Sequence, residues 1–422
     1  MKYLIAFLFC LSEMTAGAQN TSEKYNILWL SCEDIDPTLA CYGAEGIQTP
    51  NIDRLAREGI KFQNAYSTVG VCAPSRSSII TAVYPVRLGT HNMRTSNFYL
   101  YEGPDGEVYP PYRNRTGKRG RNIPWYSAVP DTGIICFTEY LRAAGYYCTN
   151  NRKNDYQFYP PFTAWDENGT NAEYENAPKD MPFFSVYNYM VTHESRILMK
   201  TNDPLLTNPS EVVVPDYYPD IPVVRKDIAR KYSNIEELDA QIGERLKKLE
   251  EEGLLDKTII FFWSDHGGPL LRQKRAVGKS GLHVPLIVRF PDKRMAGMVN
   301  TDIVSLMDLG PTVLSLAGIK PPDYMDGKAF LGDFKEEKRE AFFGSADRFD
   351  ETYDFARSVI DSEYVYIRNF NTMIPYTYRL KYREQVEMTR KLIEMDARGE
   401  LSGDAAYIFR DSRDVEELYN IK

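Results

Sequence analysis

Few histidines and cysteines occur in this chain, which has four of the former and six of the latter among 422 residues. The cysteines form no C-x-x-C pair and show no spacing typical of a zinc site. An excess of basic charge is absent as well, because the formal net charge is −8, and this argues against nucleic acid as the main partner. No apolar run is long enough for a transmembrane helix, so we expect no membrane span.

The N-terminus carries a short apolar run over residues 3–11, which follows Lys2 and precedes the tripeptide A-G-A at residues 16–18. A basic residue, a short apolar segment and an A-x-A site are typical of a secretory signal peptide. We therefore predict a signal peptide over residues 1–18 and export to the periplasm or the medium. Its removal leaves five cysteines, an odd number, so at least one thiol is unpaired.

Apolar strand-like runs alternate with helical patterns along most of the chain. Hydrophobic residues make up 43% of it, which is enough for a large buried core. The predicted strands are 26–31, 183–190, 258–265 and 284–290, and the predicted helices are 49–59 (with Thr49 as N-cap), 137–145, 226–252, 305–318 and 381–398. Nearly all-apolar strands between helices predict an α/β fold with a mostly parallel, mixed central sheet covered by helices on both faces. We expect a main domain over residues 19–340 and a smaller α+β subdomain over residues 341–422.

Ionisable side chains follow three of the predicted strands at their carboxyl ends. Glu33 and Asp34 follow one strand, Asp265 and His266 follow another, and His193 follows a third. In parallel sheets a ligand site lies beyond the carboxyl ends of the strands, so we expect these groups to meet. An oxygen-rich set suits Ca²⁺ or Mg²⁺ better than zinc. The alternative for Glu33 and Asp34 is that they cap a helix.

Cys72 lies in the segment "CAPSR", where Pro74 indicates the start of a helix. A helix N-terminus favours an anion because of its free N–H groups and its dipole. Arg76 follows one helical turn after Cys72. The pattern therefore predicts a thiol with a lowered pKa. No histidine is near Cys72 in the sequence, so a plain cysteine hydrolase would lack its base.

The segment "CAPSR" followed by "SSIIT" resembles the sulfatase signature C-x-P-S-R-x-x-x-L-T-G, with Ile80 in place of leucine and Ala82 in place of glycine. The resemblance extends over residues 26 to about 318, through "NILWLSCED", "TPNIDRLAREGIKFQNAY", "LDAQIGERLKKLEEEGLLDKTIIFFWSDHGG" and "GLHVPLIVRFP". The segment "EELYN" near the end is also similar. This resemblance implies an alkaline-phosphatase-like fold, with residues 19–340 as the catalytic domain.

In sulfatases a formylglycine-generating, or sulfatase-maturating, enzyme converts the signature cysteine to formylglycine, whose hydrated aldehyde is the nucleophile. The resemblance therefore implies that Cys72 is converted and that the chain hydrolyses a sulfate ester or sulfamate. It implies one Ca²⁺ per chain, held by Glu33, Asp34, Cys72, Asp265 and His266. Arg76 would stabilise the nucleophile, Lys274 would bind the sulfate, and Lys153 would lie near the aldehyde. His193 would protonate the leaving group and contact the substrate.

One departure from the family pattern is Asp155, which stands where the family has a histidine two residues after the lysine near the aldehyde. An aspartate can accept the same proton when sulfate is eliminated from the enzyme. His91 and His283 are interpreted as ordinary polar or packing residues. As an alternative, His91 with Arg94 would contact the substrate.

The substrate is less sharply defined by the sequence. Residues 212–239 are similar in arrangement to the heparan N-sulfatases, or N-sulphoglucosamine sulphohydrolases, which favours a heparin- or heparan-type glycosaminoglycan saccharide. The alternatives are a formylglycine-dependent phosphodiesterase or phosphonate monoester hydrolase, and a catalytically silent glycan-binding protein. The basic side chains within residues 96–130 have two equally favoured interpretations, a solvated surface loop and a patch that binds sulfate groups. Relatives usually continue beyond a motif like "EELYN", so the resemblance leaves open whether the C-terminal subdomain is complete.

Overall fold

The computed structural model describes residues 24–93, 115–116, 122–123 and 127–422. The predicted signal peptide, Arg94 and the basic side chains of the 96–130 loop lie outside the described residues. Among the residues that are described, no helix combines the length and the apolar character that crossing a membrane requires.

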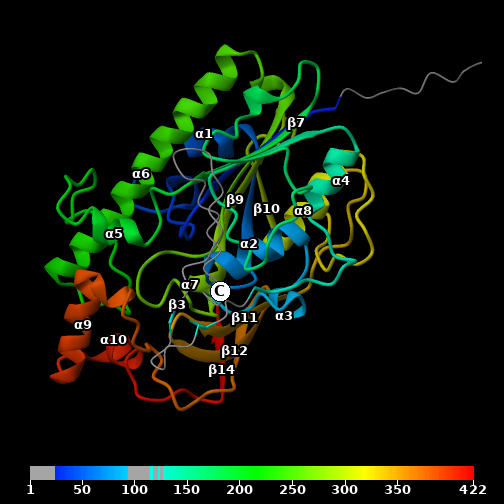
Figure 1. Ribbon diagram of the computed structural model, residues 1–422. Helices are drawn as coiled ribbons and strands as arrows, with labels where there is room; N and C mark the ends of the chain where they lie inside the picture. Colours follow the sequence, from blue (N-terminus) through cyan, green and yellow to red (C-terminus); the bar gives the residue numbers. More distant parts are fainter. Residues whose placement is uncertain (1–23, 94–114, 117–121, 124–126) are drawn as a thin grey trace, which may run out of the picture.

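An eight-stranded sheet forms the centre of the molecule, with the strand order β10-β2-β9-β8-β1-β7-β5-β6 (Figure 1). β9 runs antiparallel to β2 and β8, and the other neighbouring strands are parallel. The prediction of a mostly parallel, mixed sheet is therefore confirmed. The strands are β1 (Asn26–Cys32), β2 (Ile60–Tyr66), β5 (Tyr147–Asn151), β6 (Glu167–Gly169), β7 (Phe183–Tyr189), β8 (Thr258–Ser264), β9 (His283–Arg289) and β10 (Met298–Ser305).

Helices cover both faces of this sheet, with α1 and α6 on one face and α2, α4 and α8 on the other (Figure 1). Alternate residues of β1 serve the two faces: Leu28 and Leu30 pack with α1 and α6, whereas Ile27 and Trp29 pack with the opposite layer. The strand is therefore apolar throughout its length. The helices are α1 (Pro50–Glu58), α2 (Cys72–Thr81), α3 (Pro85–Leu88), α4 (Phe137–Ala143), α5 (Ser195–Met199), α6 (Pro222–Glu251), α7 (Lys279–Leu282), α8 (Leu309–Leu316), α9 (Glu387–Ala397) and α10 (Gly403–Tyr407).

A separate antiparallel sheet of four strands follows in the C-terminal region, in the order β11-β12-β13-β14. Its buried side chains, such as Phe342 and Ile367, join a core cluster with Val71 and Cys72. This sheet therefore packs against the segment that leads into α2 (Figure 1). The domain boundary at residue 340 stays a prediction. The strands are β11 (Phe342–Phe349), β12 (Thr352–Ile360), β13 (Tyr364–Asn369) and β14 (Glu416–Asn420), and a short ribbon elsewhere pairs β3 (Arg115–Thr116) with β4 (Asn122–Ile123).

Two carboxylates of α6 cap neighbouring helices. Asp239 accepts hydrogen bonds from the backbone N–H groups of Asn51 (3.1 Å) and Ile52 (2.8 Å) at the start of α1. Asp227 accepts one from the N–H of Met388 (2.8 Å) at the start of α9, and burial raises the pKa of Asp227 to about 6. Because the first N–H groups of a helix lack partners within the helix, these contacts hold α1 and α9 against α6.

The helix that carries Cys72 ends at Thr81, and the next residue, Ala82, has φ 57°. This left-handed conformation favours glycine, which has no Cβ to clash with the backbone. The Ala82 carbonyl accepts hydrogen bonds from the N–H groups of Asp326 and Gly327, both at 2.9 Å. Ala82, which stands where the sulfatase signature has glycine, thus adopts the backbone conformation that favours glycine.

Candidate active site

The carboxyl ends of β1, β7 and β8 lie side by side at one edge of the central sheet, because Cys32 of β1 pairs with Tyr189 of β7 and with Ser264 of β8. Cys72 meets this edge as the first residue of α2. Its Sγ lies 3.4 Å from Nε2 of His266. The structure therefore brings together the three strand ends and the signature cysteine, as the sequence pattern predicts.

The side chains at this edge form two overlapping groups of metal-ligand type. One group consists of Glu33, Asp34, Cys72 and His193, the other of Cys72, Asp265 and His266, and within each group the ligand atoms all lie within 4.8 Å of one another. All of these side chains are buried. Three of the six side chains are carboxylates, and such oxygen ligands fit a hard cation such as Ca²⁺.

His266 is oriented by its backbone surroundings. Its Nδ1 lies 2.9 Å from the carbonyl of Gly267, and its Nε2 lies 2.9 Å from Oδ1 of Asp34. A ligating histidine commonly donates its second N–H to a backbone carbonyl, which fixes the ring. The arrangement of His266 therefore suits a metal ligand that binds through Nε2.

Three cationic side chains balance the buried carboxylates. Arg76 pairs with Glu33 and places its Nε 3.1 Å from Oδ2 of Asp265. Lys153 lies 2.5 Å from Glu33 and Lys274 lies 2.7 Å from Asp34, each measured from Nζ to a carboxylate oxygen. The guanidinium of Arg76 is thus directed at two carboxylates of the cluster.

These contacts determine the charge of each carboxyl group. Burial opposes ionisation of Glu33 and Asp34, but their cationic neighbours outweigh it and hold both pKa values well below the ordinary range. Burial and the nearby Glu33 raise the pKa of Asp265. Burial also opposes a charge on His266, but Asp265 and Asp34 outweigh it and raise its pKa well above the usual value.

The prediction of a lowered pKa for the Cys72 thiol is wrong. Burial raises it, and the nearby Lys153 and Lys274 oppose this effect without outweighing it. Cys72 is 0% exposed, a consequence of tertiary packing that the helix-start pattern does not include. An unmodified thiol at this position therefore has a smaller thiolate fraction than a free cysteine at the same pH. None of the five described cysteines forms a disulfide.

His193 belongs to the cluster, and Asp155 lies beside it. The Nδ1 of His193 lies 2.9 Å from Oγ of Ser195 and 3.2 Å from the backbone N of the same residue, so Ser195 holds the ring through Nδ1. Burial, with a contribution from Lys274, lowers the pKa of His193 to about 4. Asp155 has a left-handed φ of 53°, and its Oδ2 lies 3.6 Å from Nζ of Lys153.

The remaining predicted residues lie apart from this cluster. The Nε2 of His283 donates a hydrogen bond to the carbonyl of Gln63 (2.8 Å), and its ring lies 5.2 Å from that of Tyr66, which supports a packing role. His91 belongs to neither ligand group, and its buried Nδ1 has no hydrogen-bond partner among the described residues. Lys279, for which the sequence suggests no role, is the half-buried first residue of α7.

Three residues of the site were not predicted from the sequence. Asn188 accepts a hydrogen bond from Arg76 (2.7 Å). The N–H of Glu194 donates to Asp34 (2.7 Å), and the Glu194 carboxylate pairs with Arg275 through two contacts of 2.9 Å. Glu194 directly follows His193 at the end of β7, so the same strand-end rule could have identified it.

Comparisons with known proteins agree with this geometry. Residues 25–319 match the sulfatase family, and residues 267–397 match the C-terminal region of N-sulphoglucosamine sulphohydrolase. An ulvan-active sulfatase of Formosa agariphila is 39% identical over 95% of this chain and 70% of its own length. The human N-sulphoglucosamine sulphohydrolase is 25% identical over 83% of this chain and 74% of its own length.

The fold has solved counterparts as well. A structure described in complex with its substrate D-glucosamine-2-N,6-O-disulfate superposes with a TM-score of 0.61, at 18% identity, over 82% of this chain and 89% of that chain. At this identity the similarity concerns the fold alone. Because the family match spans residues 25–319 and the Formosa relative is 39% identical over nearly the whole chain, this protein belongs to the sulfatase family of enzymes, with their alkaline-phosphatase-like fold.

Proposed function

We propose that the protein is a formylglycine-dependent sulfatase that removes sulfate from a glycan. The observation that carries the proposal is the position of Cys72. It begins α2 within the signature "CAPSR", and its Sγ lies within 4.8 Å of ligand atoms of Glu33, Asp34 and His193. A cysteine whose thiol pKa is raised by burial, yet which is surrounded by carboxylates, lysines and two histidines, is suited to conversion into another nucleophile.

The proposed substrate is a sulfated saccharide carrying sulfate esters or sulfamates. Of the two relatives described above, the one that is 39% identical is named for activity on ulvan, and the one that is 25% identical is named for N-sulphoglucosamine. Heparin- or heparan-type saccharides remain the prediction from residues 212–239, and ulvan-type saccharides are the second class to test. The net charge of the chain is negative, so local cations such as Lys153 and Lys274 must attract the anionic substrate.

The donor set fits a single Ca²⁺, which Glu33, Asp34, Asp265 and His266 would hold together with residue 72. Bound there, the ion would supply positive charge that stabilises an oxyanion and polarises sulfate oxygens. Conversion of Cys72 would supply a hydrated aldehyde as the nucleophile.

The other side chains would position the substrate and transfer protons. Arg76 would keep Glu33 and Asp265 in place through its ion pairs. Lys153 and Lys274 would contact sulfate oxygens with their ammonium groups. The His193 ring would present Nε2 to the leaving oxygen, and the negative charge of the bound substrate would favour its protonated form. Asp155 would accept the proton that is lost when sulfate leaves the enzyme.

Maturation and export are part of the proposal. Every residue of α2 is buried in the folded chain, so a formylglycine-generating enzyme would have to act on Cys72 before folding is complete. The segment over residues 1–18 would direct the chain out of the cytoplasm, to the periplasm or the medium.

The test is sulfate release from a panel of saccharides by protein coexpressed with a formylglycine-generating enzyme, with Cys72→Ala as the matched control. The panel contains heparin disaccharides, ulvan oligosaccharides and a phosphonate monoester. We expect sulfate release from at least one saccharide by the parent protein and none by Cys72→Ala. Faster turnover of the phosphonate monoester would favour the alternative hydrolase activity, and saccharide binding without release would favour a silent binding protein.

A further inference from the structure

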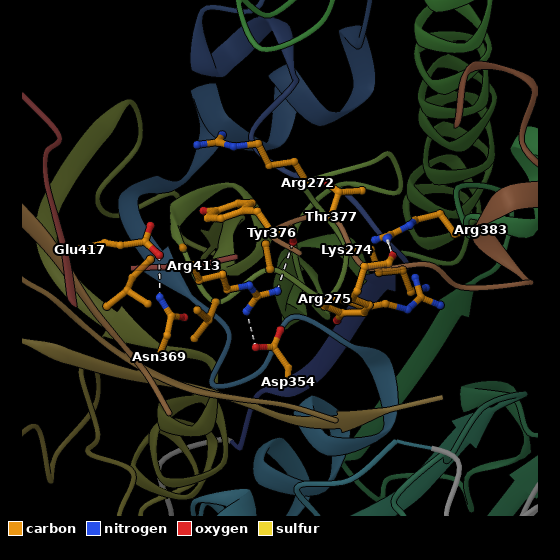
Figure 2. Close-up of a pocket in the computed structure, with 15 residues that line it drawn as sticks. Arg272, Lys274, Arg275, Asp354, Asn369, Tyr376, Thr377, Arg383, Arg413 and Glu417 are labelled. Carbon is orange, nitrogen blue, oxygen red and sulfur yellow. Dashed lines mark hydrogen bonds and ion pairs between the residues drawn. The ribbon is translucent and has the colours of Figure 1, made fainter. Parts of the chain in front are cut away.

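A pocket lies between the loop that carries Lys274 and the C-terminal region of the chain (Figure 2). Residues 272–278 line one side of it, and side chains of the C-terminal region, from Asp354 to Glu417, line the other. The pocket therefore lies where the catalytic domain meets the C-terminal sheet.

The lining of this pocket is strongly cationic. It contains five basic side chains and two acidic ones: Arg272, Lys274, Arg275, Arg383, Arg413, Asp354 and Glu417. Three of the basic groups are already paired, Lys274 with Asp34, Arg275 with Glu194, and Arg413 with Asp354. Within the described part of the chain, Arg272 and Arg383 form no ion pair.

Several buried donors of the pocket also lack hydrogen-bond partners among the described residues. Arg383 is 6% exposed and donates to the carbonyl of Tyr378, but its Nε has no partner. The hydroxyl of Tyr378, which is 5% exposed, and the Nε of Arg413 have none either. Figure 2 shows Arg413 between Asp354 and Tyr376 in the middle of the pocket. Burial of an unpaired guanidinium is costly, so this set of donors points to an anionic ligand.

The pocket adjoins the candidate active site through one loop. Lys274 lines the pocket while its ammonium contacts Asp34, and the adjacent Arg275 pairs with Glu194, whose N–H donates to the same aspartate. Arg272 and Arg275 both adopt left-handed φ values, 64° and 75°. Such conformations are uncommon for residues other than glycine, and two of them within four residues place this loop among the strained segments that often surround functional sites.

We propose that this pocket is an oxyanion subsite, which receives a second sulfate or carboxylate group of the saccharide while the first sulfate is at the active site. Guanidinium groups suit this role because they match the geometry of oxyanions and stay charged when buried. The inference rests on the proposed function and refines it. The substrate is then a saccharide with at least two anionic groups, and the pocket acts on substrate binding more than on the chemical step.

The first test compares two substrates that share the same scissile sulfate and differ in one further sulfate or carboxylate group. In Arg383→Gln we expect KM for the doubly anionic substrate to rise by about 10- to 100-fold, the range expected for lost hydrogen bonds to a charged group, with kcat little changed. KM for the singly anionic substrate should stay the same. The control is Arg379→Gln, because Arg379 belongs to the same segment but has a side chain 64% exposed and paired with Glu384.

A second variant keeps the test decisive if Arg383→Gln does not fold. Arg272 is half-buried, and its Nε also lacks a partner among the described residues, so Arg272→Gln should show the same selective rise in KM. An equal loss for both substrates, or no change for either in both variants, would overturn the subsite.

Failure of the proposed function would be recognised separately, since the parent protein would then release no sulfate from any saccharide. Binding to Cys72→Ala protein still tests the pocket in that case. We expect the doubly anionic saccharide to bind more tightly than the singly anionic one, and this difference to vanish in the Arg383→Gln and Arg272→Gln backgrounds. Equal binding of the two saccharides would overturn the proposal.

Discussion

Addition of Ca²⁺ to metal-free protein is predicted to raise its thermal stability. Glu33, Asp34 and Asp265 are fully or almost fully buried at one site, where Arg76, Lys153, Lys274 and His266 are the cationic groups that contact them. Unfolding disperses these carboxylates, so the ion binds the folded chain far better than the unfolded one. At a free concentration 100 times the Kd, this stabilisation is about 2.7 kcal/mol.

The expected change in Tm follows from the length of the chain. The entropy of unfolding is about 2.1 cal/mol/K per residue, which over 422 residues gives about 0.9 kcal/mol/K, so the shift is about 3 °C. Differential scanning calorimetry of EDTA-treated protein, with and without Ca²⁺, measures it. Asp34→Asn should lose most of the shift, whereas Asp323→Asn, at an exposed position, should keep it. No shift in the parent protein, or an equal shift in Asp34→Asn, would refute the reasoning.

His193→Ala should slow hydrolysis of a sugar sulfate about 10²–10⁴-fold and that of an aryl sulfate far less, because a phenolate leaves without a proton; equal losses in the two steady-state rates would count against a general acid. Asp155→Asn should give a first burst of alcohol release in rapid-quench experiments and then slow turnover on both substrates, and absence of the burst would reassign this residue. Asp227→Asn should raise Tm at pH 8 but not below pH 3.8. Since burial raises the pKa of Asp227 to about 6, its contribution to stability is complete below its ordinary value of 3.8 and is lost as the pH rises through 6. The loss is about 3 kcal/mol, because the pKa rises from 3.8 to about 6 and each pKa unit corresponds to about 1.4 kcal/mol. Asparagine can still accept the hydrogen bond from the N–H of Met388. A variant no more stable than the parent at pH 8 would contradict this account.

The location of the site could be predicted from the sequence because strand ends are visible in it. Glu33 directly follows β1, Asp265 directly follows β8, and His193 lies a few residues after the end of β7. Because these strands are parallel neighbours, their carboxyl ends lie at one edge of the sheet. The start of α2 could be predicted equally well, because Pro74 lies in its first turn and Cys72 is its first residue. Local sequence patterns were therefore sufficient to predict which segments meet at the site, because the direction of the strands and of α2 determines where their ends lie.

Features that depend on tertiary packing could not be predicted in this way. Thr49 is the N-cap residue of α1 by position, but its hydroxyl makes no capping bond, and Asp239 of α6 caps the helix instead. The pKa of Cys72 was predicted in the wrong direction because the helix-start argument omits burial. The ion pair of Glu194 with Arg275 joins residues 81 positions apart, and no local pattern indicates such a contact.

The mass of the proteolytic peptide that contains Cys72 tests the central claim most directly. The protein is coexpressed with a formylglycine-generating enzyme, together with a control sulfatase in the same cells, and both peptides are measured by mass spectrometry. We predict that the Cys72 peptide has the mass of the aldehyde form. A free thiol at Cys72, under conditions that convert the control sulfatase, would contradict the proposed mechanism.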